Sequence, residues 1–189
     1  MWTLPNFLTI GRIAAAPVVA LAALAPAGSA WAWLAFALFA LAALTDYADG
    51  WLARRLDQKS ALGVMLDPIA DKVMVIVVLA SLMGAVGEGG GRLLVMLPAL
   101  AIVLRELLVS GLREYLGDVK LPVTSLAKWK TAAQLTAVGA LLFAHAVPSL
   151  APLGGVALAV LWVAAALTGW TGLDYFRQAG PHLSAREGG

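Results

Sequence analysis

Long apolar stretches, separated by short turns rich in glycine, proline or polar residues, run through the whole chain. No charged residue occurs between Arg12 and Asp46, and Pro26, Gly28 and Ser29 interrupt this stretch near its middle. A stretch of this length accommodates two membrane-crossing helices and a tight turn. Continued along the chain, the pattern predicts six helices at about residues 7–25, 30–54, 63–86, 92–116, 126–146 and 153–176, followed by a polar tail.

Composition supports a membrane location. The chain has 189 residues, of which 61% are hydrophobic and 13% charged, and its mean hydropathy is +0.87. These values lie far outside those of soluble domains. Cysteine is absent, which excludes disulfides and thiol chemistry. We therefore expect an all-α integral membrane protein with a single transmembrane domain over residues 1–189, in contact with membrane lipids and with no nucleic-acid partner.

The N-terminal apolar run imitates a secretory signal, because small residues follow it at positions 28–30. Only Arg12 precedes the run as a basic residue, and the start carries Trp2 and Pro5. We expect the segment to be retained as the first helix.

Basic residues are distributed unevenly between the two ends of the predicted helices. Six spans bring both termini to one side, and among the 13 Lys and Arg residues only Arg92 falls at the opposite end of its helix. Arg105 lies partway along its span. Cytoplasmic loops of membrane proteins carry an excess of Lys and Arg, so the side of the termini is predicted to be cytoplasmic. This orientation predicts a multi-pass protein of the cytoplasmic (inner) membrane.

Four aspartates stand out against the apolar background, on two stripes with helical spacing. The first stripe consists of Asp46, Asp49, Gly50, Ala53 and Arg54, and the second of Gly63, Asp67 and Asp71. Two helices joined by a short polar connection would turn the stripes toward each other. Carboxylates that converge at low dielectric repel strongly unless a multivalent cation lies between them. Hard oxygen ligands without cysteine favour Mg²⁺ or Mn²⁺ over zinc.

Pairing with cations for structure is the alternative role of these carboxylates. Arg54 and Lys72 are available to neutralise two of the four charges, while the small residues on the same faces leave room for a ligand. Two metals held by shared carboxylates are suited to displacement at phosphorus, because they stabilise the attacking and leaving groups together. A transporter that relays cations or protons through carboxylates is the rival class. A relay would distribute its carboxylates along a path, whereas these four lie at one depth.

The two stripes carry a resemblance to a known family. Asp46-x2-Asp49-Gly50-x2-Ala53-Arg54-x8-Gly63-x3-Asp67-x3-Asp71 resembles the complete signature of the CDP-alcohol phosphatidyltransferase family. Four further motifs resemble the bacterial phosphatidylglycerophosphate synthase branch of that family. They are Leu4-Pro5-Asn6-x-Leu8-Thr9-x2-Arg12, Arg105-Glu106-x2-Val109-Ser110-Gly111-Leu112-Arg113, Lys128-x-Lys130-Thr131-x2-Gln134 and Asp174-Tyr175. Together the motifs cover nearly the whole chain.

The resemblance implies six transmembrane helices, a homodimer, and transfer of a phosphatidyl group from CDP-diacylglycerol to an alcohol with release of CMP. It assigns two divalent ions to Asp46, Asp49, Asp67 and Asp71. It places Gly50, Ala53 and Arg54, together with Asp49, beside the CDP group, with Asn6 and Arg12 approaching from the N-terminal segment. In the family, the residue corresponding to Asp71 is the proposed general base toward the acceptor hydroxyl.

The acceptor is the less specific part of the prediction. We assign its phosphate to Arg105, Arg113, Lys128 and Lys130, because a guanidinium within a span, such as that of Arg105, needs an anion. Alternatively, the two lysines are ordinary cytoplasmic-side residues, and Glu114 pairs with Arg113. Glu106 points elsewhere on its helix and is expected to pair across helices. The favoured acceptor is glycerol 3-phosphate, and its rivals are inositol phosphate, serine and phosphatidylglycerol.

Overall fold

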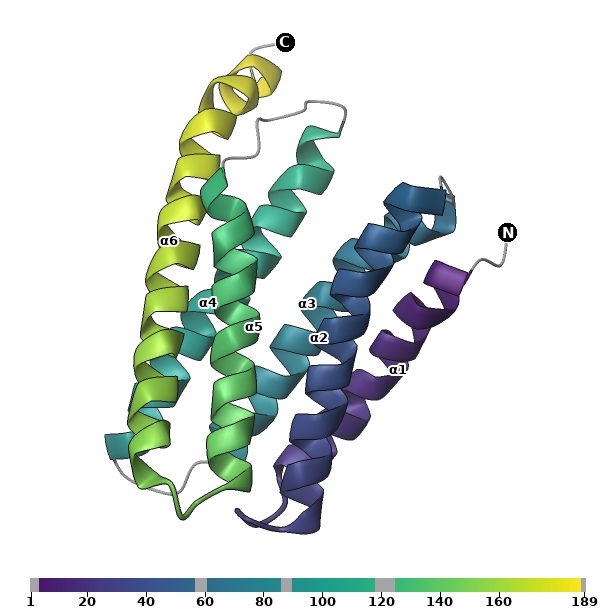
Figure 1. Cartoon of the computed structure of the whole chain (residues 1–189). Coiled ribbons are helices and arrows are strands. Elements are labelled where there is room, and N and C mark those ends of the chain that lie inside the picture. Colours follow the sequence, from purple (N-terminus) through teal and green to yellow (C-terminus); the bar gives the residue numbers. More distant parts are fainter. Residues whose placement is uncertain (1–3, 57–60, 86–89, 118–124, 188–189) are drawn as a thin grey trace.

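Helices make up almost all of the part of the chain that the structure describes. The computed structural model describes residues 4–56, 61–85, 90–117 and 125–187. Within these ranges there is no strand, and the helices are α1 (Leu4–Ala23), α2 (Ala30–Leu56), α3 (Ala61–Ala85), α4 (Gly90–Leu116), α5 (Ser125–Ala146) and α6 (Ala151–Glu187). Successive helices run in opposite directions, so both termini lie at the same end of the bundle (Figure 1). The predicted all-α class is confirmed, and the first five helices agree with their predicted bounds to within three residues.

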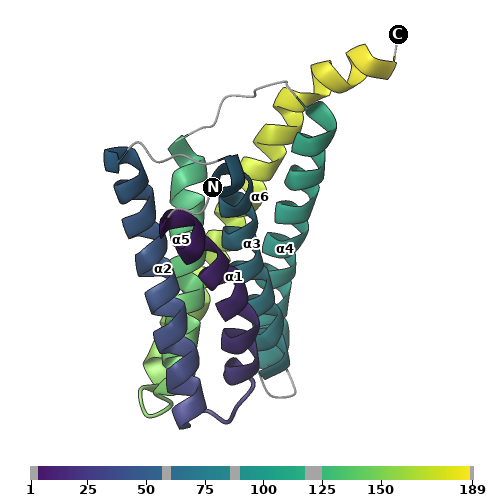
Figure 2. The same cartoon turned by 90° about the vertical axis from the view of Figure 1, so that its right-hand side faces the viewer.

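The sixth helix is longer than predicted. The predicted end of this helix at about residue 176 is wrong, because α6 continues through the polar residues to Glu187 and has 37 residues. At about 1.5 Å per residue it is roughly 56 Å long, well beyond the hydrocarbon thickness of about 30 Å. The loss of apolar residues does not end the helix, and Pro181 lies inside α6. Proline removes one backbone hydrogen bond and bends a helix, and the C-terminal end of α6 leans away from the bundle in Figure 2.

Small and aliphatic side chains form the core between two groups of three helices. α1 packs against α2 and α3, α6 packs against α4 and α5, and contacts of α2 and α3 with α4 and α5 join the groups. Many of the buried residues are alanines, among them Ala16, Ala35, Ala99 and Ala164. Helices in a membrane gain little from the hydrophobic effect and associate through close packing of small residues, so this core fits a bundle in lipid.

The outer surface is apolar. Exposed side chains include Leu21, Leu44 and Leu108, and the tryptophans Trp31 and Trp129. Three described helices are long and apolar enough to cross a membrane, at Asn6–Ala23, Gly91–Leu116 and Pro152–Leu183, and Ala30–Asp46 and Lys72–Ala85 are shorter apolar stretches. A surface of this kind requires lipid or protein around it.

The turns at the end opposite the termini are joined by hydrogen bonds. The Gly28 amide donates to the His145 carbonyl at 3.0 Å, and His145 Nε2 lies 2.8 Å from the Ala25 carbonyl oxygen. Gly28 has a φ of +76°, and a side chain there would meet Pro148 Cγ at 3.1 Å. Glycine therefore serves both the left-handed conformation and the close approach. These contacts hold the α1–α2 turn against the C-terminal end of α5.

Candidate functional site

The residues of the family signature lie in the C-terminal half of α2 and the N-terminal half of α3, and the predicted nucleotide residues Asn6 and Arg12 lie on α1. Of the signature side chains, those outside the described residues are Asp49, Gly50, Ala53, Arg54, Asp67 and Asp71. Among the described residues no group of three or more His, Cys, Asp or Glu side chains is placed to hold a metal, and only Asp46 of the four predicted ligands belongs to that part. The convergence of the four carboxylates stays a prediction.

Asp46 forms an ion pair with Arg12 of α1. The Arg12 guanidinium donates through Nη1 to Asp46 Oδ1, and its Nη2 lies 3.5 Å from Thr9 Oγ1. Arg12 is 6% exposed, whereas the Asp46 side chain is 36% exposed. α1 therefore brings a buried positive charge to the first aspartate of the signature. This partner differs from the cations considered from sequence, Arg54 and Lys72.

Asp46 and Arg12 line a pocket between α1, α2, α3 and α5. Its other lining residues are Phe39, Ala42, Ala43, Ala70, Met74 and Leu135. The pocket is polar where the ion pair lies and apolar elsewhere. Ala70, which immediately precedes Asp71 in the chain, shares this pocket with Asp46. The Asp46 carboxylate is partly exposed and directs one oxygen toward Arg12. Its other oxygen is suited to serve as a ligand of a hard cation.

A second polar cluster lies between α4, α5 and α6, and we call it the Glu106 cluster. Its members are Arg105 and Glu106 of α4, Lys130 and Gln134 of α5, and Thr168 and Thr171 of α6. Glu106 Oε1 accepts hydrogen bonds from Lys130 Nζ, from Arg105 Nη1 at 3.2 Å and from Gln134 Nε2 at 3.3 Å. The expectation that Glu106 pairs across helices is confirmed by its contact with Lys130. The expectation that it points away from Arg105 is wrong, because Arg105 Nη1 donates to it.

The α6 side of the cluster consists of two threonines. Thr168 accepts from Gln134 Nε2 at 2.8 Å, and Thr171 accepts from Arg105 Nη2 at 3.3 Å. Three helices thus contribute to one connected network. Buried polar groups of this kind are stable only when they are paired.

The charges of the Glu106 cluster do not cancel. Arg105 and Lys130 share the single carboxylate of Glu106, which leaves one excess positive charge. The Arg105 Nε atom is buried and has no hydrogen-bond partner among the described residues. Lys130 is 7% exposed. An ordinary lysine at the membrane surface would be exposed to water, so this alternative does not hold for Lys130. A buried excess cation with an unsatisfied donor is the feature expected of an anion-binding site.

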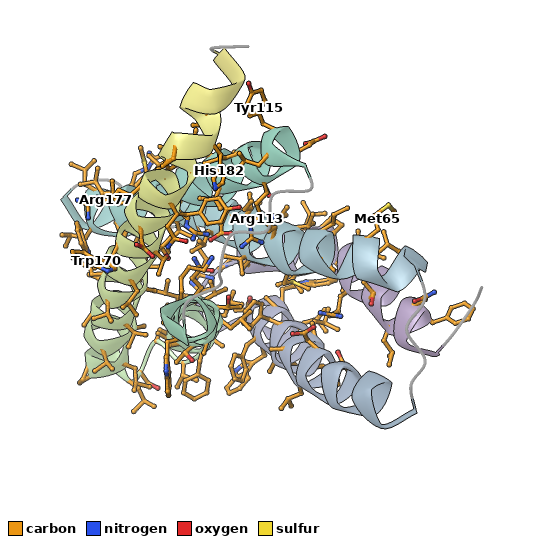
Figure 3. The ribbon with its side chains drawn as sticks, turned by 90° about the horizontal axis from the view of Figure 1, so that it is seen from above. Met65, Arg113, Tyr115, Trp170, Arg177 and His182 are labelled. Carbon is orange, nitrogen blue, oxygen red and sulfur yellow. The ribbon has the colours of Figure 1, made fainter. Side chains whose placement is uncertain are left out.

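Arg113, which follows Glu106 on α4, and Lys72 of α3 have contacts outside this cluster. The Arg113 guanidinium carbon lies 5.2 Å from the centre of the Tyr175 ring on α6, within the range of a cation–π contact. Arg113 lies in the last turn of α4, and Figure 3 shows it beside α6. Lys72 Nζ donates to Ser110 Oγ and joins α3 to α4. The side chain of the fourth predicted cation, Lys128, lies outside the described residues.

Thr168, Thr171 and Gly172 belong to none of the sequence motifs. A signal for the threonines exists, since two hydroxyl residues at helical spacing occur within an otherwise apolar span. Gln134, four residues after Lys130, follows the same spacing. Asn6 of α1, assigned to the nucleotide, is 1% exposed.

Comparison with known proteins agrees with the motifs. A profile described as CDP-alcohol phosphatidyltransferase matches residues 2–170. Relatives named CDP-diacylglycerol–glycerol-3-phosphate 3-phosphatidyltransferase include a Cereibacter sphaeroides protein that is 42% identical, with 96% of this chain and 97% of the relative covered. A Rickettsia bellii protein of that name is 43% identical over 92% and 93% of the two chains, and one from Pseudomonas fluorescens is 39% identical over 95% and 91%. With the complete signature on α2 and α3, these similarities show that the chain belongs to the CDP-alcohol phosphatidyltransferase family.

Proposed function

We propose that the protein transfers the phosphatidyl group of CDP-diacylglycerol to glycerol 3-phosphate, giving phosphatidylglycerol phosphate and CMP. The observation that carries this proposal is the buried excess positive charge of the Glu106 cluster, since a phosphorylated acceptor needs such a site and serine does not. The names of the relatives, which match over more than nine-tenths of both chains, support the same acceptor.

The donor side of the reaction belongs to α2 and α3. Asp46, Asp49, Asp67 and Asp71 would hold two Mg²⁺ or Mn²⁺ ions, which when bound neutralise the pyrophosphate oxygens and acidify the acceptor hydroxyl. Gly50, Ala53 and Arg54 border the cytidine diphosphate, with Asn6 and Arg12 on its N-terminal side. Support comes from the part-exposed carboxylate of Asp46, which lies in a pocket shared with the residue next to Asp71.

The chemical step is a displacement at the phosphorus that carries the lipid. The acceptor hydroxyl oxygen forms the new P–O bond, the bond from this phosphorus to the bridging oxygen breaks, and CMP leaves with that oxygen. Asp71 takes the proton of the hydroxyl. A carboxylate near a metal is a weak base, so its contribution is one of position.

The acceptor's phosphate is bound by cations of α4 and α5. Arg105 and Lys130 supply the excess charge of the Glu106 cluster, and Arg113 and Lys128 lie toward the same end of the bundle. An Arg guanidinium meets two phosphate oxygens at once. The unpaired Nε–H of Arg105 supports this role.

In the membrane, the six helices are six spans, both termini are cytoplasmic, and the site opens to the cytoplasm of the inner membrane. The protein functions as a homodimer. The common end of the two termini (Figure 1) and the exposed leucines of the outer surface support this arrangement.

An acceptor panel tests the proposal. Purified protein is supplied with CDP-diacylglycerol, Mg²⁺ and one of glycerol 3-phosphate, inositol phosphate, serine or phosphatidylglycerol, and CMP release is measured. We expect release with glycerol 3-phosphate and none in an Asp71→Asn control. A faster reaction with another acceptor would keep the reaction class and overturn the acceptor.

A further inference from the structure

One face of α6 lies against the basic residues of α4. The residues of this face are Thr168, Thr171, Gly172 and Tyr175, whose spacings of 3, 4 and 7 from the first place them on one helical stripe. Thr168, Thr171 and Gly172 are buried, whereas Trp170 on the same turns is 63% exposed and points outward in Figure 3. The stripe therefore faces the α4 and α5 residues of the Glu106 cluster.

Gly172 lies directly against the stem of Arg105. A Cβ atom built at Gly172 would be 2.8 Å from Arg105 Cγ and 3.4 Å from its Nε. Carbon atoms in contact are normally about 3.5–4.0 Å apart. Cγ is close to the backbone of α4, so it cannot move away as the tip of a flexible side chain would. The absence of a side chain at Gly172 is what permits the present path of Arg105.

Thr171 fixes the far end of the same side chain. Its Oγ1 lies 2.9 Å from the Leu167 carbonyl oxygen. A hydroxyl has one proton to donate, so donation to this carbonyl leaves the oxygen as an acceptor for Arg105 Nη2, at 3.3 Å. Glu106 accepts from Nη1. With both terminal nitrogens held, the orientation of the Arg105 guanidinium is determined.

We propose that Thr171 and Gly172 are positioning residues for the acceptor's phosphate, because together they hold the Arg105 guanidinium in its binding orientation. α6 thereby contributes to selection of a phosphorylated acceptor without touching it. This inference rests on the proposed function, in which Arg105 binds that phosphate.

A matched pair of glycine substitutions tests the role. Gly172→Ala introduces the methyl group that meets Arg105 Cγ, whereas a Cβ at Gly169, on the same helix, has nothing within 4 Å. Alanine raises helix propensity at both positions. In the CMP-release assay we expect Gly172→Ala to raise the KM for glycerol 3-phosphate roughly tenfold with little change in the KM for CDP-diacylglycerol, and Gly169→Ala to alter neither.

Thr171 provides a second, milder test. Thr171→Val keeps the shape and removes the acceptor, while Thr171→Ser keeps the hydroxyl. We expect the acceptor KM to rise several-fold in Thr171→Val and to stay near the wild-type value in Thr171→Ser. This pair decides the question if Gly172→Ala does not fold.

The double variant Gly172→Ala/Arg105→Ala tests whether Gly172 affects the acceptor KM through Arg105. Without the Arg105 stem the new methyl group has nothing to displace, so Gly172→Ala should add no further rise in acceptor KM. A full additional rise would overturn the positioning role. So would an unaltered acceptor KM in folded Gly172→Ala and Thr171→Val variants of an otherwise active enzyme. A wild-type protein that releases no CMP with glycerol 3-phosphate would instead refute the proposed function itself.

Discussion

Removal of the Glu106 carboxylate is the sharpest test of the buried cluster. Glu106→Gln keeps the size of the side chain but leaves Arg105 and Lys130 without their shared anion, so the local charge rises from +1 to +2. Both partners of the Glu106–Lys130 pair have side chains that are 8% exposed, which leaves little water to screen the charges. Loss of one partner from a buried pair costs about 3–5 kcal/mol.

This loss is large enough to measure by thermal unfolding in detergent. For a chain of this length about 1 kcal/mol changes Tm by about 2–4 °C, so we expect a decrease on the order of 10 °C. Glu114→Gln is the matched control, because it makes the same chemical change at an exposed position of α4. Surface charges contribute about 0–1 kcal/mol, and the control should unfold near the wild-type temperature.

A double-mutant cycle with Lys130→Met tests the assigned pairing. The double variant Glu106→Gln/Lys130→Met returns the local charge to +1, so its destabilisation should be smaller than the sum of the two single effects, by about 0.5–3 kcal/mol. Strict additivity would refute the pairing. An unchanged Tm in Glu106→Gln alone would refute the wider view that this carboxylate holds two buried cations in place.

Three further predictions concern the substrates. EDTA should abolish CMP release and Mg²⁺ or Mn²⁺ should restore it, and full activity in chelator would contradict the metal assignment. Gly50→Leu should prevent binding of CDP-diacylglycerol in a folded protein, because a side chain there would fill the space beside the nucleotide; Gly155→Leu, where a Cβ meets nothing within 4 Å, is the control. Arg105→Ala should raise the acceptor KM tenfold or more, since each lost charge-assisted hydrogen bond is worth about 1.5–3 kcal/mol, and Arg105→Lys should rescue only in part. An equal loss for both substrates together with a lower Tm would assign Arg105 a structural role instead.

The sequence alone was sufficient for the helices and for the reaction class. Apolar runs and their interruptions are local features, so the bounds of α1 to α5 followed from them to within a few residues. The spacing of the signature is likewise local, since all eight of its positions fall between Asp46 and Asp71 on two helices. The end of α6 did not follow, because polar residues after Phe176 can continue a helix and the loss of apolar residues does not mark its end.

Only the tertiary structure decided which charged and polar side chains contact one another. The pairs Lys130–Glu106, Arg12–Asp46 and Arg105–Thr171 join residues 24, 34 and 66 positions apart. In a membrane protein both the lipid face and the buried face of a helix are apolar, so the hydrophobic pattern does not reveal which face meets which neighbour. The contact of Gly172 with Arg105 depends on how closely α6 approaches α4, and that distance is set by packing across the whole bundle.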